Sequence, residues 1–189
     1  MDTRRIEEAV RELLLAIGED PSRKGLLDTP NRVALAFTEL FSGVGVDETD
    51  GLIGDSSTAD VDGKDPIILK NLDFRSICEH HLLPFHGIAH IAYQPNGVVL
   101  GLGRIARLLE IVSSRPQVQE RIGESICSAL ESGAGVSGAL VVLEAKHDCV
   151  MSRGARQAMA AAVTVTAVGD FGNEPTRSAV LALIGNSSD

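Results

Sequence analysis

Apolar side chains recur at helical spacing in two segments near the start of the chain. The first segment covers residues 3–17 and is followed by Gly18, a common helix stop. The second begins at Thr29, which we expect to cap the helix, with Pro30 in its first turn. The apolar positions on the two stripes are Ile6, Val10, Leu13, Leu14, Ile17, Val33, Phe37, Leu40 and Phe41. The pattern therefore predicts two amphipathic helices within residues 1–45.

In the next segment, apolar residues do not recur at a regular spacing. Residues 44–66 contain seven acidic residues, one lysine and scattered glycines, a composition that predicts a loop or linker. We therefore expect an N-terminal helical region (1–45), an acidic loop (46–66) and a main domain (67–189).

Strand signals then replace the helical period. Residues 67–77 are rich in β-formers, and residues 86–102 are predicted as two strands around a Q-P-N-G turn. Two helices follow on either side of Pro116, and strand signals return at 138–151 and 161–168. The order after the acidic loop is ββααββ, which predicts an α+β domain with a largely antiparallel sheet.

Composition and charge narrow the class of protein. A length of 189 residues with 44% hydrophobic residues suits one globular domain with a modest appendage. The net charge of −9 argues against general nucleic-acid binding, because phosphate backbones attract clustered Lys and Arg. No apolar run reaches the ~20 residues of a membrane helix, and the N-terminus lacks the apolar core of a secretory signal. We therefore expect a cytoplasmic protein with no membrane partner and three reduced cysteines.

The densest group of metal-capable side chains is the sequence CEHH, which starts at Cys78. Cys78 and His81 are three positions apart, so one turn can direct a thiolate and an imidazole at one point, and this pair suits zinc. Alternation along the third long strand places His147 and Cys149 on its core-facing side. If the two segments are neighbours in the sheet, Cys78, His81 and Cys149 can bind Zn²⁺ with a fourth position open, as in a catalytic site.

Each of these side chains also has a simpler explanation. Cys149 alone is more typical of a small core residue, and single histidines are more often hydrogen-bonded structural groups. Cys127, on a predicted helix, is interpreted as a packing residue. The combination of CEHH with HDC favours metal binding over packing.

Several long motifs, in order, resemble the GTP cyclohydrolase I family. They are GEDPSRKGLLDTPNRVA from residue 18, CEHHLLPFHGIAHIAYQP, RPQVQER and EAKHDCVMSRG, and they extend over nearly the whole chain. The resemblance implies the tunnelling fold, in which ββααββ subunits form a barrel and two rings stack into a toroidal homodecamer. It also implies active sites at subunit interfaces, built on a catalytic domain over residues 67–189.

The resemblance implies a role for each polar residue that matches a functional position of the family. It makes Cys78, His81 and Cys149 the zinc ligands, the same three that spacing selects. His80 and His147 take proton-transfer roles. Without the resemblance, Glu120 would be interpreted as part of a solvated helix face and the arginines as ordinary surface charges. These implied substrate-binding residues are Glu120 and Gln119 at the guanine ring, and Arg32, Arg104, Arg107 and Arg153 at the triphosphate.

The implied reaction is the first step of folate and pterin biosynthesis. Zinc-dependent hydrolysis of GTP releases C8 of the purine as formate, and ring closure gives 7,8-dihydroneopterin triphosphate without an organic cofactor. Gly103 and Leu35 depart from the family pattern and remove polar groups expected near the phosphates. A second hypothesis is therefore a divergent enzyme that opens another purine nucleotide for a specialised pterin or deazapurine pathway. A third is a structural or nucleotide-sensing oligomer whose metal only stabilises the fold.

Overall fold

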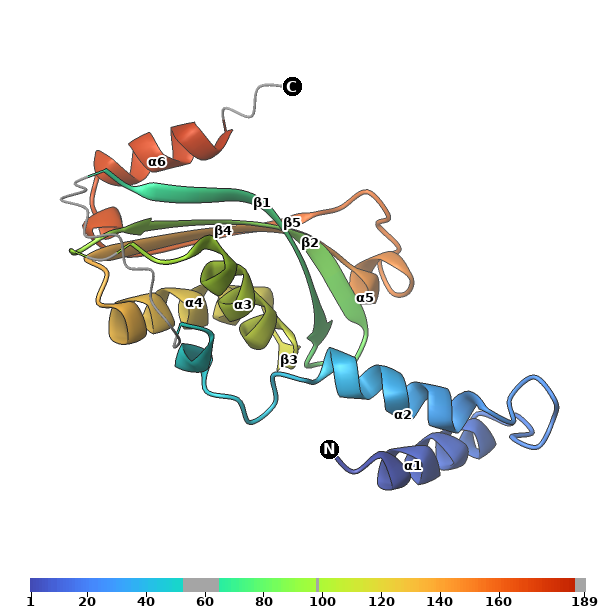
Figure 1. Ribbon diagram of the computed structural model, residues 1–189. Helices are drawn as coiled ribbons and strands as arrows, with labels where there is room; N and C mark the ends of the chain where they lie inside the picture. The colour runs from blue at the N-terminus through green and yellow to red at the C-terminus, as the bar shows by residue number, and fades with distance from the viewer. Residues whose placement is uncertain (53–64, 98, 186–189) are drawn as a thin grey trace.

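The computed structural model describes residues 1–52, 65–97 and 99–185. A curled five-stranded sheet carries helices on both of its faces (Figure 1). Its order is β3-β1-β2-β4-β5, and every neighbouring pair is antiparallel except β1 with β3. The predicted α+β class with a largely antiparallel sheet is confirmed. The strands are β1 (Ile67–Cys78), β2 (Pro84–Gln94), β3 (Pro116–Gln117), β4 (Gly138–His147) and β5 (Ala162–Gly169).

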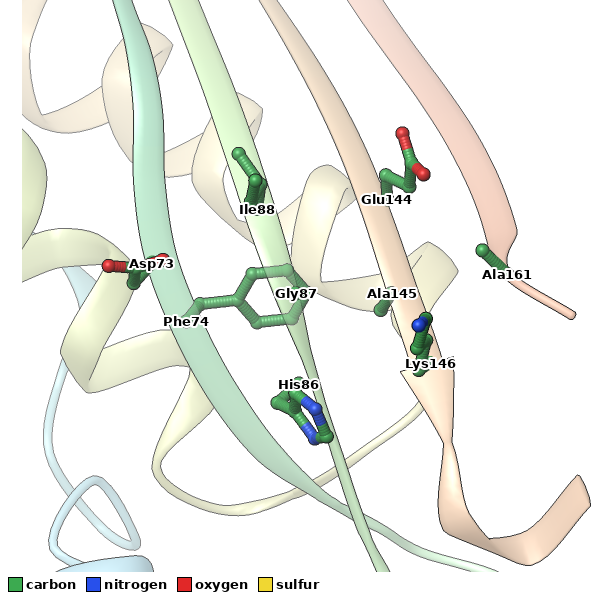
Figure 2. A pocket seen from close by; sticks show the side chains of 9 residues that line it. All are labelled: Asp73, Phe74, His86, Gly87, Ile88, Glu144, Ala145, Lys146 and Ala161. Atoms are coloured by element: carbon green, nitrogen blue, oxygen red, sulfur yellow. The ribbon is translucent and has the colours of Figure 1, made fainter. Parts of the chain in front are cut away.

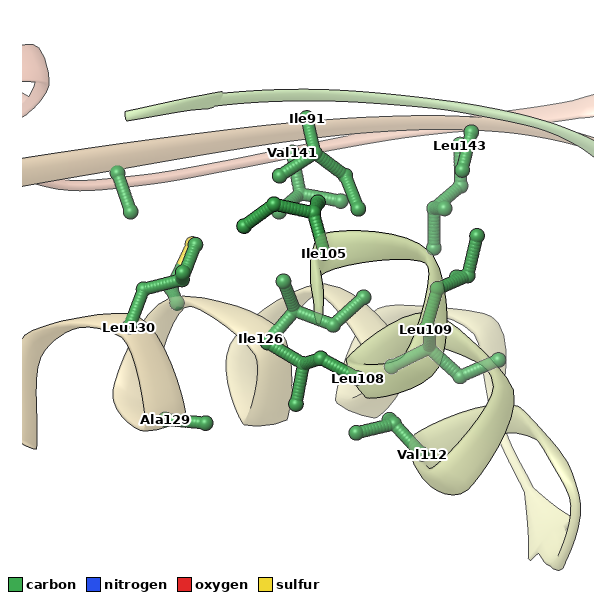
Figure 3. Packing of buried hydrophobic residues seen from close by; sticks show 14 of the residues in the cluster. Ile91, Ile105, Leu108, Leu109, Val112, Ile126, Ala129, Leu130, Val141 and Leu143 are labelled. Atoms are coloured by element: carbon green, nitrogen blue, oxygen red, sulfur yellow. The ribbon is translucent and has the colours of Figure 1, made fainter. Parts of the chain in front are cut away.

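Two helices, α3 (Leu102–Ser113) and α4 (Gln119–Ala134), cover one face of the sheet and form the main core with it (Figure 1). Their apolar stripes, which include Ile105 and Ile126, face inward-pointing residues of the sheet such as Val141 (Figure 3). All three side chains are almost completely buried. Apolar burial on this face therefore fixes how α4 lies against β4.

A smaller cluster lies on the opposite face of the sheet, beneath α6 (Thr176–Gly185) (Figure 1). Leu140 of β4 packs there with Phe171, which belongs to the short 3₁₀ helix η2 (Asp170–Gly172). Because successive side chains of a strand point to opposite faces, the neighbouring Val141 joins the main core instead.

The strands β2 and β4 come unusually close at Gly87. A Cβ atom there would lie 1.9 Å from the main-chain oxygen of Glu144 and 2.6 Å from the Cα of Ala145. Only glycine fits this approach of two backbones. The curled sheet therefore depends on a missing side chain at this point.

The two predicted N-terminal helices are confirmed as α1 (Thr3–Ala16) and α2 (Thr29–Leu40), which pack against each other beyond the sheet (Figure 1). Asp28, not Thr29, is the N-cap residue of α2, without a side-chain hydrogen bond. The apolar stripe of α1 is only partly covered within the chain, since Leu13 remains 59% exposed. In the described ranges, no helix is long and apolar enough to cross a membrane.

Two strand predictions are wrong in part. Residues 99–101 do not form the second strand expected after the Q-P-N-G turn. The N–H of Leu100 instead donates to the Tyr93 hydroxyl at 3.0 Å, and α3 begins directly afterwards. The strand predicted over 138–151 ends at His147, where the short helix α5 (Asp148–Met151) begins.

Part of the segment predicted as an acidic loop packs on the core. Residues Glu48–Gly51 form the 3₁₀ helix η1 against α3, and Leu52 is buried in the main cluster. The rest of that segment, residues 53–64, lies outside the described residues.

The sheet has open edges within the described chain. The strand β3 pairs with β1 only at Ile77 and Cys78, which leaves the rest of that edge of β1 without a strand partner. At the other end of the sheet, β5 pairs with β4 alone. Unpaired strand edges of this kind can accept a strand from another chain.

Candidate metal centre and its surroundings

Strand register brings the two halves of the predicted metal site together. In β2, Pro84 pairs with Ile77 of β1, and the next residue, Phe85, pairs with His147 of β4. The end of β1 and the end of β4 therefore flank the start of β2. Cys78 closes β1, and Cys149 follows β4 within α5.

A tight turn directs Cys78 and His81 at the same point. The N–H of Leu82 donates to the Cys78 carbonyl at 2.8 Å, and the N–H of Cys78 donates to the Leu83 carbonyl at 2.8 Å. Leu82 adopts a left-handed backbone conformation with φ of 52°, which reverses the chain. His81 Nδ1 consequently lies 3.8 Å from Cys78 Sγ.

The ligand atoms of Cys78, His81 and Cys149 all lie within 4.8 Å of one another. Tetrahedral zinc with bonds of about 2.0 to 2.3 Å needs its ligands roughly 3.5 to 3.8 Å apart, so small side-chain shifts suffice. The sequence prediction named the same three residues that the structure brings together, although Cys149 reaches the group from a helical turn and not along the strand pleat. Across the described residues, no fourth His, Cys, Asp or Glu joins the group.

The electrostatics of the group also fit a cation. Cys78 is buried, Cys149 is half-buried and His81 is exposed, so the group is open on one side. Burial, followed by the neighbouring Cys78 sulfur, raises the pKa of the Cys149 thiol. A cation bound beside the two sulfurs would offset this shift, because the thiolate is the form of cysteine that binds a metal.

His147 is held rigidly two positions before Cys149. Its ring stacks on Phe85 with centroids 4.5 Å apart and planes 5° from parallel. His147 Nε2 lies 2.8 Å from Gln119 Oε1. Burial lowers the pKa of His147, and the nearby Glu120 carboxylate opposes this shift. The predicted proton carrier is thus fixed in orientation and lies near the predicted guanine-binding carboxylate.

The two predicted guanine-binding residues lie in different environments. Glu120 is exposed in the first turn of α4, where its carboxylate can meet a ligand. Gln119 is 2% exposed, and its side chain points into the protein. The structure therefore offers only the Glu120 side chain to a base.

His80, the other predicted proton carrier, lies beside the metal group. Its Nδ1 is 3.9 Å from Cys78 Sγ, and its side chain is 64% exposed. The intervening Glu79 is bound by Arg121 of α4 through two contacts of 2.5 and 3.2 Å, and this arginine lowers the pKa of the Glu79 carboxyl. The sequence reasoning missed this pair, which ties the CEHH turn to α4.

The alternation of polar residues in RPQVQER could have revealed that this segment contacts the CEHH turn and β4. Gln117, Gln119 and Arg121 are spaced two apart and all contact metal-site segments or the strands that carry them. The carbonyl of Gln117 accepts from the N–H of Glu79 at 3.0 Å. The side chain of Gln117 is 2% exposed and donates to the Val112 carbonyl.

Three of the four predicted phosphate-binding arginines contact other groups in this chain. Arg104 donates to the main-chain oxygen of Leu52, Arg107 contacts Glu110 at 2.8 Å, and Arg32 contacts Asp28 at 3.5 Å. Arg153, in the exposed segment after α5, is close enough to oppose the raised pKa of Cys149. The fold of one chain thus brings Arg153 to the metal group.

Two hollows lie near the metal group or elsewhere on the surface. A groove of about 900 Å³ runs between α1 and α2 and reaches His81. A depression of about 460 Å³ lies on the sheet, lined by His86, Glu144 and Lys146 among others (Figure 2). No residue of that depression belongs to the predicted site.

Comparison with known proteins identifies close relatives. A model of the family described as GTP cyclohydrolase I matches residues 6–185. The chain is 50% identical over 184 residues to GTP cyclohydrolase 1 of Leifsonia xyli subsp. xyli, with 97% of this chain and 96% of that protein covered. It is 44% identical over 185 residues to GTP cyclohydrolase 1 of Streptococcus mutans, with 97% and 95% covered.

We expect replacement of Cys149 to abolish tight metal binding. Cys149→Ala removes one of three ligands and should lower the bound metal per chain from about one to below about one tenth, as measured by elemental analysis after dialysis. Cys127→Ala is the matched control, because the Cys127 thiol is buried in the core, where its Sγ contacts the Thr166 carbonyl. Equal metal content in the two variants would contradict the assignment.

Proposed function

The chain belongs to the GTP cyclohydrolase I family, and we propose that it converts GTP to 7,8-dihydroneopterin triphosphate and formate. The observation that carries the proposal is the group Cys78, His81 and Cys149, whose ligand atoms lie within 4.8 Å of one another. A structural zinc site normally uses four protein ligands, whereas this group offers three among the described residues. The open side supports a hydrolytic centre over a purely stabilising one.

We propose that the bound ion is Zn²⁺, because two thiolates and one imidazole are a donor set that zinc prefers. When bound, zinc supplies the Lewis-acid chemistry that makes hydroxide available near neutral pH for attack at C8 of the purine. Cys78, His81 and Cys149 would hold the ion. Ligand thiols must stay reduced, which supports the cytoplasm as the place of the reaction.

His80 and His147 are the proposed proton carriers. Hydrolysis, ring opening and ring closure each require protons to move, and an imidazole can accept a proton at one nitrogen and donate one from the other. The stacked ring of His147 has one defined orientation, which suits transfer to a fixed substrate atom. His80 is more exposed and reaches the same group from the CEHH turn.

Glu120 is the proposed guanine reader. Its carboxylate can accept from the N1–H and the exocyclic amino group of the base together. The effect of Glu120 on the pKa of His147 supports a base position within reach of that ring.

A triphosphate carries more negative charge than Arg153 alone can neutralise. We propose that Arg153 acts from the same chain and that Arg32, Arg104 and Arg107 act from neighbouring copies in a toroidal homodecamer. The open edges of β1 and β5 and the exposed stripe of α1 support such an assembly. Arg107 is 57% exposed and pairs with Glu110 at the surface, so its release to a ligand costs little.

Formate release tests the proposed function directly. The zinc-loaded wild type should release one formate per GTP consumed and form a product that fluoresces after oxidation, because C8 leaves and a pterin ring closes. Cys127→Ala should retain this activity, and Cys149→Ala should lose it. No formate from assembled, zinc-loaded protein would reject the proposal. Faster turnover of GDP or GMP would instead support the divergent enzyme suggested by Gly103 and by Leu35, which is 55% exposed.

Replacement of Glu120 should reduce guanine recognition specifically. Glu120→Gln removes a charge-assisted contact worth about 1.5 to 3 kcal/mol, which corresponds to roughly a 10- to 150-fold loss of kcat/KM for GTP. Inosine triphosphate lacks the exocyclic amino group, so its kcat/KM should fall less. Glu124→Gln, one helical turn further along α4, serves as the control. An equal loss for both nucleotides would argue against base reading by Glu120.

Mixed assemblies should reveal sites shared between copies. Arg107→Ala and Cys149→Ala are expected to be inactive alone, yet co-refolded mixtures should regain activity. In an equal mixture, about a quarter of the interfaces combine an intact Arg107 from one chain with an intact Cys149 from its neighbour. Assemblies should have about ten times the 19.9 kDa chain mass by light scattering. No recovery in mixtures of that mass would argue against Arg107 acting from a neighbouring copy.

A further inference from the structure

Gln119 makes side-chain contacts that determine how its amide is oriented. Its Nε2 lies 3.0 Å from the carbonyl oxygens of both Leu143 and Ala162, and 3.2 Å from Thr164 Oγ1. A carbonyl oxygen can only accept, so the NH₂ group must face these two carbonyls. The amide oxygen must therefore face His147, at 2.8 Å from its Nε2. Two strands, β4 and β5, thus exclude the flipped amide.

The orientation of this amide determines the hydrogen on His147. An amide oxygen can only accept, so the hydrogen of the contact must be on His147 Nε2. In the neutral ring the other nitrogen, Nδ1, then carries the lone pair. Stacking on Phe85 holds the plane of the same ring. The environment of His147 thus selects both its plane and its tautomer.

We propose that Gln119 is a positioning residue that acts through His147, keeping the hydrogen on Nε2 and so leaving the lone pair of the neutral ring on Nδ1. This inference rests on the proposed function, in which His147 transfers protons. It reassigns the Gln119 side chain from substrate binding, because that side chain is 2% exposed and its amide hydrogens already have acceptors. Only the Glu120 side chain remains for the guanine ring.

A purely structural role for Gln119 makes a different prediction. The amide also connects α4 to β4 and β5, so its loss could disturb the site as a whole. A general disturbance lowers activity whether or not His147 is present, whereas an effect transmitted through His147 disappears once that ring is gone. The two roles are therefore separable by a double-mutant cycle.

The test measures formate release by Gln119→Met, His147→Ala and the double variant, all as zinc-loaded assemblies. Methionine keeps the length and volume of the side chain but neither accepts from Nε2 nor donates to the two carbonyls. Gln119→Met should lower kcat about 10- to 100-fold with KM for GTP changed less than about threefold, because the reacting geometry and not substrate binding is altered. In the His147→Ala background the same replacement should change kcat less than about twofold.

Gln117→Met is the matched control. Gln117 is equally buried, and its amide donates to the Val112 carbonyl. Any loss it causes should be of the same size with and without His147. If Gln119→Met lowers kcat equally in both backgrounds, or mainly raises KM, the positioning role is wrong while the proposed function stands. If the wild type releases no formate, the proposed function fails and this inference fails with it.

Discussion

The pairing of β2 with both β1 and β4 is the constraint on which the site depends. Cys78 and Cys149 are 71 positions apart, and they meet because Pro84 and Phe85 of β2 pair with the last stretch of β1 and of β4 respectively. A shift of register by one residue would turn the alternating side chains of a strand to the other face. Burial of the core-facing residues of these strands therefore also sets the ligand geometry.

The first turn of α4 also connects the two halves of the site. Arg121 binds Glu79 in the CEHH turn, and Gln119 contacts His147 at the end of β4. The helix lies in place because its apolar stripe is buried against the sheet (Figure 3). Packing of α4 on the sheet thus positions the polar groups of its first turn, and a few hydrogen bonds then fix their contacts.

The group of candidate metal ligands was predictable because its signals are local: a three-residue spacing in one turn and a His and Cys at one strand end. The side chain of Gln119 was not, since its inward direction depends on carbonyls of β4 and β5 that are distant in sequence. Regular elements followed from periodicity, but the strand expected after the Q-P-N-G turn failed because the Tyr93 hydroxyl satisfies the Leu100 N–H. Burial of Leu52 gave no periodic signal, because the few apolar residues of the acidic segment do not recur at helix or strand spacing.

The open edges of β1 and β5 have a consequence for how the protein is made. An unpaired strand edge can accept a strand from another chain, so the edges left open in the described part of the chain expose it to non-specific β-pairing. Such pairing leads to aggregation during expression and refolding, and it speeds up with concentration. Slow synthesis and chaperone protection should therefore improve recovery more than raising the amount of chain produced.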